Sequence, residues 1–200
     1  MEHNNHQGGE QQDDNEKNEK LQLTPPRIYV ASLADYVAGR LHGSWLEVSG
    51  DADELAEGVA AMLAGSRLPG AEEWAIHDYE GFGPLRLGEY ETLETVARLA
   101  RAIAEHGPAP MHWADLVSNT DEATLDEFDN VYQGHWESLT AFADSLWDDC
   151  GYEGVLDEVI PEGLRSYVRF DAEAYARDLE LGGFIVSSEG DGGVYIFGAP

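Results

Sequence analysis

Residues 128–149 read FDNVYQGHWESLTAFADSLWDD, a stretch that combines large aromatic residues and acidic residues with no lysine or arginine. Trp136 and Phe142 belong to a set of apolar residues at helical spacing, which is typical of a helix with one buried face. A segment this rich in apolar side chains can bury enough surface to offset its conformational entropy, unlike a disordered acidic tail. We therefore predict a short strand over 128–133 and a helix over 136–149.

The absence of basic residues extends far beyond this stretch. The 63 residues between Arg101 and Arg165 contain fifteen Asp and Glu and no Lys or Arg. Residues 27–200 hold 34 acidic residues and nine arginines, a net charge of −25 out of −29 for the whole chain. This charge disfavours binding to nucleic acid or to an anionic membrane surface and favours basic proteins or cations as partners. Self-repulsion also favours an elongated arrangement of small modules.

The pattern of apolar residues divides the chain into a tail and three modules, and predicts an α+β fold with antiparallel sheets. Residues 1–26 are polar and predicted to be disordered. An N-terminal α+β module is expected over 27–87, a small helical bundle over 88–125 and a second module of sheet and helices over 126–200. No repeat of solenoid period is present.

Individual elements are predicted from periodicity, capping residues and turn residues. The expected strands are 27–33, 44–48, 72–79, 128–133, 183–188 and 193–197, the last two joined by the turn-rich sequence EGDGG. The expected helices are 53–64, 89–105, 111–118, one that begins at Thr120, 136–149 and 171–180.

The sequence contains no motif that indicates an enzyme or a cofactor. Cys150 is the only cysteine, which excludes an intramolecular disulfide and a thiolate zinc site. The run HDYE (77–80) does not form a site on a regular strand, because His77 and Tyr79 would face away from Asp78 and Glu80. DDCGYEGVLDE (148–158) is the nearest approach to a calcium loop but lacks its ligand pattern.

Three further expectations concern location and local contacts. The N-terminus lacks the apolar region of a signal peptide, and the longest apolar runs are too short to span a bilayer, which favours a cytoplasmic protein with no membrane partner. His106 and His112 flank a proline-containing loop and are interpreted as ordinary loop residues. Arg177 and Asp178 are expected to form a local ion pair.

The acidic residues are the candidate partner-binding surface. In the helix predicted over 136–149, Glu137, Asp144 and Asp148 would share the outward face, and Glu122, Asp126 and Asp129 repeat this pattern on the preceding segment. Like charges at this spacing cost stability, which indicates that the charge itself is required. The candidate residues are Asp115, Glu122, Asp126, Glu127, Asp129, Glu137, Asp144, Asp148, Asp149, Glu153, Asp157 and Glu158.

The charge density of this surface can be compared with that of DNA. Duplex DNA carries one charge per ~1.7 Å of axis, or one per ~3.4 Å on each strand. An acid at every fourth residue of a helix gives one charge per roughly 6 Å. Several elements side by side are therefore needed to approach the density of a duplex, so any resemblance to DNA must be assembled by the fold.

Four blocks of sequence carry a resemblance to a known family. They are IYVASLADYVAGRLHGSW (28–45), HDYEGF (77–82) with GEYETL (88–93), YQGHWESLTAFA (132–143), and AYARDLE (174–180) before GGVYIF (192–197). In this order and spacing they make the chain, across about residues 27–200, similar to the ArdA antirestriction family.

The resemblance implies an acidic, three-module, dimeric protein without catalytic activity that imitates DNA. Members of the family occupy the DNA-binding groove of type I restriction-modification enzymes. From the residues themselves, the edge of the C-terminal sheet, with Phe184, Ile185, Val194 and Ile196, is the candidate dimer interface. Two alternatives stay open: imitation of DNA toward another basic DNA-binding protein, and a salt-adapted structural protein whose charge serves solubility.

Overall fold

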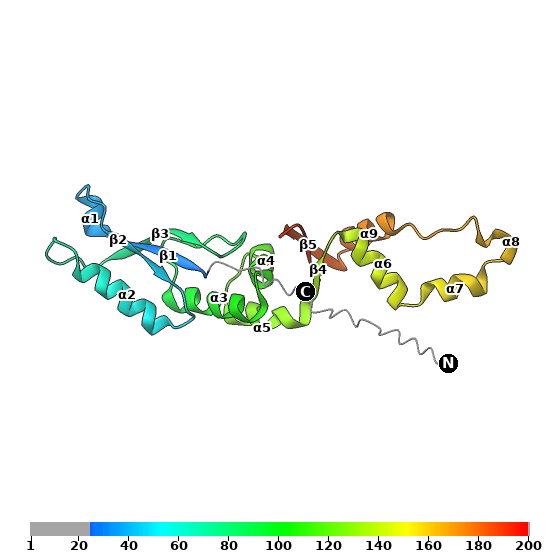
Figure 1. The fold of residues 1–200 in the computed structure, drawn as a ribbon, viewed down its shortest axis with the longest axis horizontal. Coiled ribbons are helices and arrows are strands. Elements are labelled where there is room, and N and C mark those ends of the chain that lie inside the picture. Colours follow the sequence, from blue (N-terminus) through cyan, green and yellow to red (C-terminus); the bar gives the residue numbers. More distant parts are fainter. Residues whose placement is uncertain (1–24, 200) are drawn as a thin grey trace, which may run out of the picture.

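The computed structural model describes residues 25–199, so the predicted disorder of the N-terminal tail lies almost wholly outside the described residues. The described chain is an α+β protein with two three-stranded antiparallel sheets. The two sheets and the helices follow one another along a long axis, and the molecule is elongated (Figure 1).

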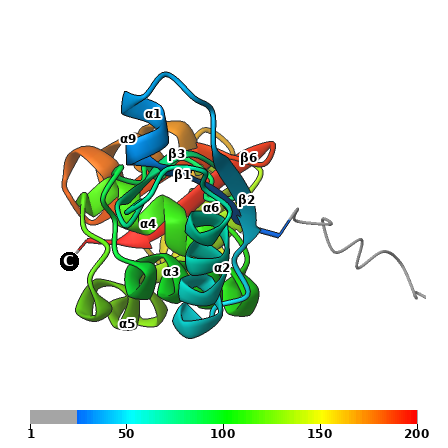
Figure 2. The same ribbon diagram turned by 90° about the vertical axis from the view of Figure 1, so that its left-hand side faces the viewer.

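The first sheet has β1 (Arg27–Ser32) at its centre, between β2 (Gly43–Glu47) and β3 (Trp74–Glu80). The three predicted strands are thus present. Helix α2 (Ala52–Ala64) packs against β1 and β2, and its first turn is capped by the Asp51 carboxylate, which accepts hydrogen bonds from two backbone N–H groups. The short helix α1 (Leu33–Val37), which was not predicted, lies at the periphery of the molecule (Figure 1 and Figure 2).

Three helices follow the first sheet: α3 (Leu93–His106), α4 (Ala109–Val117) and α5 (Glu122–Val131). Helix α3 begins after the cap Thr92, four residues later than predicted. Helix α5 is capped by Asp121 instead of Thr120. Because α5 continues to Val131, the strand predicted over 128–133 is wrong for its first four residues, and Phe128 is a buried helical residue.

The second sheet joins a mid-chain strand to the C-terminal hairpin. Strand β4 (Tyr132–Trp136) pairs with β6 (Gly193–Gly198), which also pairs with β5 (Ile185–Gly190) across the predicted turn. Helices α6 (Leu139–Asp149) and α9 (Ala172–Leu181) pack against each other beside this sheet. In the sequence, α6 and α9 are separated by α7 (Tyr152–Val159) and α8 (Glu162–Arg165), neither of which was predicted.

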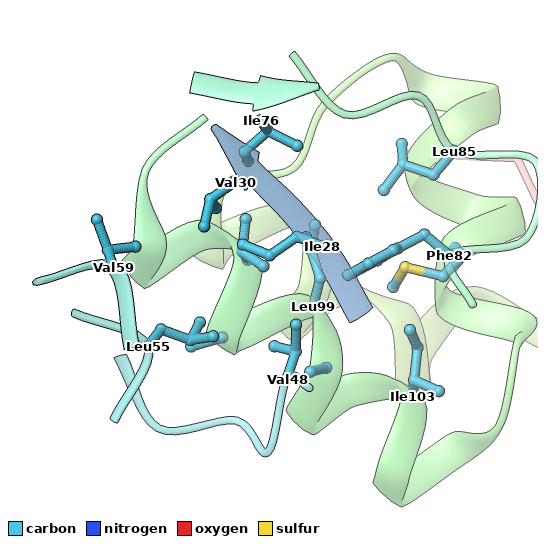
Figure 3. Close-up of a cluster of buried hydrophobic side chains, with 14 of the residues drawn as sticks. Ile28, Val30, Val48, Leu55, Val59, Ile76, Phe82, Leu85, Leu99 and Ile103 are labelled. Atoms are coloured by element: carbon cyan, nitrogen blue, oxygen red, sulfur yellow. The ribbon is translucent and has the colours of Figure 1, made fainter. Parts of the chain in front are cut away.

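The apolar side chains of residues 25–199 form three cores whose limits differ from the predicted module boundaries. The largest core combines β1, α2, α3 and part of α4, with Ile28, Leu55 and Leu99 in mutual proximity (Figure 3). It therefore extends across the boundary predicted at residue 87. The boundary predicted at residue 125 falls inside α5.

The two smaller cores connect the middle of the chain to its C-terminus. Trp113 from α4 and Phe128 from α5 pack against Phe197 from β6. Phe142 from α6 packs with Ile185 and Ile196 of the second sheet. Elements far apart in sequence are thus fixed to one another by apolar contacts.

Replacing Leu99 by Ala tests the role of the largest core. Leu99 is fully buried at its centre, so the cavity should lower the free energy of unfolding by about 2–5 kcal/mol. Urea unfolding followed by circular dichroism measures this change. Leu41→Ala is the matched control, since Leu41 is 94% exposed and its truncation should change the free energy by less than about 0.5 kcal/mol. Equal effects of the two substitutions would contradict this description of the core.

Candidate acidic binding surface

The twelve acidic residues selected from the sequence are all exposed. They lie on successive elements: Asp115 on α4, four residues on α5, Glu137 before α6, three residues on α6 and three on α7. These elements extend from the middle of the molecule toward one end of its long axis (Figure 1). We refer to these twelve residues as the acidic surface.

The helical residues of the acidic surface point away from the cores. On α5, Glu122, Asp126 and Asp129 are exposed as predicted, whereas Phe128 is buried. On α6, Asp144 and Asp148 are exposed while Phe142 is buried. Glu137 is exposed but precedes the helix cap Ser138, so it does not belong to the helical face that the sequence predicted.

On α7, part of the charge is neutralised within the molecule. Arg165 on α8 forms ion pairs with Glu153 and, at 2.5 Å, with Asp157. The hydrogen bond with Asp157 and the neighbouring Glu153 carboxylate raise the pKa of the Arg165 guanidinium. The sequence did not reveal these pairs, because Arg165 lies eight and twelve residues away from its partners.

In the folded chain, basic residues from α3 lie close to acidic residues of the stretch that contains no Lys or Arg. Arg98 and Arg101, which precede it on α3, line a groove together with Glu122, Asp126 and Asp129 on α5. The ring of His106 also lies 3.6 Å from the Asp129 carboxylate. The part of the acidic surface on α5 therefore has basic residues nearby, whereas Asp144, Asp148 and Asp149 on α6 form no ion pair within the described part of the chain.

His112 is a buried residue of α4, which corrects its interpretation as a loop residue. Its Nδ1 lies 2.8 Å from the Ser188 hydroxyl on β5, and its ring packs 4.2 Å from the ring of Tyr195 on β6. Burial lowers the pKa of His112 and favours its neutral form. A Cβ atom at position 190 would lie 2.5 Å from His112 Cε1, so this contact requires Gly190. The contact joins α4 to the second sheet.

Three local sequence features remain: the Arg177–Asp178 pair, the run at residues 77–80 and the acidic segment 148–158. Arg177 and Asp178 lie 3.8 Å apart, which confirms the predicted ion pair. In the pairing of β1 with β3, His77 is an extra residue on β3. The predicted alternation of side chains between the two faces of the strand therefore fails there, and both His77 and Asp78 are exposed. Residues 148–158 are mostly helical, not a calcium loop. Among residues 25–199, no group of three or more His, Cys, Asp or Glu side chains could hold a metal ion.

The candidate dimer residues occupy different environments. Phe184, next to the edge strand β5, is 68% exposed. Ile185 and Ile196 are buried in the third core, and Val194 is half-buried against it. Of these four candidates, Phe184 alone is exposed, and it lies beside β5, which is an edge strand of its sheet.

Within the described part of the chain, no helix is long and apolar enough to cross a membrane. A search of the curated proteins gave no match. The family model described as "Antirestriction protein (ArdA)" matches residues 28–192, a range that includes every helix of the described chain and, apart from Arg27 at the start of β1, all strands except β6. The match covers well over half of the 200 residues. The chain therefore belongs to the ArdA family of antirestriction proteins.

Proposed function

We propose that this antirestriction protein imitates DNA and inhibits a type I restriction-modification enzyme stoichiometrically. In this proposal the acidic surface occupies the positively charged DNA-binding groove of the enzyme and excludes DNA. The observation that carries the proposal is the exposure of all twelve acidic residues along successive elements of an elongated molecule. Its carboxylates would take the positions of DNA phosphates.

The arrangement of α5, α6 and α7 supports this proposal on physical grounds. A single helix with an acid at every fourth residue carries one charge per roughly 6 Å, which is too sparse for one DNA strand. Here several acidic elements follow one another along the long axis, so their charges add over a larger surface. Each exposed carboxylate contributes about 0–1 kcal/mol, so the affinity must come from the sum of many contacts.

Two other proposals account for the same charge: inhibition of a different basic DNA-binding protein, and adaptation to salt. Affinity capture with the purified protein at low and moderate salt distinguishes them. Recovery of restriction-modification subunits supports the first proposal, and recovery of nucleoid proteins alone supports the second. The absence of any partner whose recovery depends on salt supports adaptation to salt, and contradicts imitation of DNA.

Charge reversal tests whether inhibition is distributed over the acidic surface. We expect Asp126, Asp129, Asp144 and Asp148 changed together to Lys to weaken inhibition of DNA cleavage by roughly two orders of magnitude or more. Each single change to Ala should cost less than about fivefold, because 1 kcal/mol corresponds to a factor of about five.

The matched control reverses four exposed acids elsewhere and changes the net charge equally: Glu57, Glu72, Glu73 and Glu89. This variant should retain most of the inhibition. Complete loss of inhibition from one single substitution, or equal loss from the control, would contradict a distributed contact through the acidic surface.

We also propose that two copies associate through the edge of β5. This strand lies at one side of its sheet, and the neighbouring Phe184 is the most exposed aromatic residue of the hairpin region. Light scattering over a concentration series should detect a dimer at micromolar concentration, and Phe184→Ser should shift it toward monomer. A wild-type protein that is monomeric throughout the series would refute this interface.

A further inference from the structure

Helices α7 and α8 form an arm, residues 152–165, that extends from α6 and α9 at one end of the molecule (Figure 1). None of its residues is buried. An aromatic cluster anchors the base of the arm: the ring of Trp147 stacks 3.9 Å from that of Phe170 and lies 5.0 Å from that of Tyr152. The base is therefore fixed by packing, whereas the rest of the arm projects outward.

The arm has an apolar face that stays exposed in the described part of the chain. Tyr152, Val155, Leu156 and Val159 recur at the spacing of one helical face. Val155 is 54% exposed and Val159 is 67% exposed, and Leu164 on α8 is 56% exposed. An isolated eight-residue helix is unstable in water and normally depends on packing of its apolar face. The exposed apolar side chains therefore indicate a surface for a partner.

Charge determines which partner fits this surface. The arm carries Glu153, Asp157, Glu158 and Glu162 against Arg165 alone, a net charge of −3. Arg165 is already engaged by Glu153 and Asp157, which leaves Glu158 and Glu162 beside the apolar face. Two copies of the arm would bring charges of the same sign together, which is unfavourable. An apolar patch bordered by Lys and Arg is the complementary partner.

We propose that the arm docks Val155, Val159 and Leu164 onto an apolar patch at the border of the basic groove of the restriction-modification enzyme. This inference rests on the proposed function and adds a second kind of contact to it. Glu158 and Glu162 face the basic residues around that patch. The partner at this surface is thus the inhibited enzyme, not a second copy of the chain.

The two kinds of contact respond differently to salt. Contacts between carboxylates and basic residues weaken as the salt concentration rises, because screening increases. Burial of valine and leucine side chains depends on the apolar area removed from water and not on charge. The arm therefore supplies a part of the affinity that persists at a salt concentration where the acidic surface alone binds weakly.

The test is the double variant Val155→Ser/Val159→Ser, which leaves charge unchanged and helix propensity nearly so. Its dissociation constant for an intact type I restriction-modification complex is measured by surface plasmon resonance at several salt concentrations. We expect at least roughly tenfold weaker binding at every concentration, with an unchanged slope of log Kd against log salt. Val37→Ser/Leu41→Ser, at two exposed apolar residues far from the arm, is the matched control and should bind like wild type.

The other possible results separate a failure of the arm's role from a failure of the proposed function. Unchanged affinity of the double variant, while wild type binds, overturns the role of the arm and leaves the proposed function intact. Conversion of a wild-type dimer to monomer by the double variant, measured by light scattering, assigns the arm to a second copy and also overturns the inference. Absence of wild-type binding to the enzyme refutes the proposed function and this inference together. Circular dichroism and urea unfolding of the variant verify that its fold is intact.

Discussion

Mutual repulsion among the 34 acidic side chains of residues 27–200, opposed by nine arginines, is the constraint on which the rest of this structure depends. The apolar cores must offset this repulsion, and they do so as three clusters distributed along the chain. An elongated molecule keeps the charges further apart than a sphere of the same size would. The same arrangement exposes the acidic residues of α4 to α7, so the shape that limits repulsion also leaves this charge accessible on the surface.

The elements with strong local signals could be predicted from the sequence. Strand β1 has alternating β-branched and aromatic residues, α2 has Asp51 as a cap, and the C-terminal hairpin has a turn rich in glycine. The exposure of the acidic residues also followed from their spacing relative to the apolar positions. The short helices α1, α7 and α8 were missed because four to eight residues provide too little periodicity.

Contacts between distant residues could not be predicted. His112 resembles a loop residue because it follows two prolines, yet its contact with Ser188 spans 76 positions. The groove that places Arg98 near Asp126 and the pairing of Arg165 with Glu153 likewise depend on the fold. Basic residues thus lie near the acidic residues of α5 and α7, whereas the acidic residues of α6 form no ion pair within the described part of the chain.

Competition with DNA tests the central claim most directly. A fluorescently labelled duplex bound to a type I restriction-modification complex is titrated with this protein, and release of the duplex is followed by anisotropy at several salt concentrations. Imitation of DNA predicts full displacement at a stoichiometric ratio, with an affinity that falls as salt rises. A ternary complex that retains the duplex while DNA cleavage is inhibited would contradict the account.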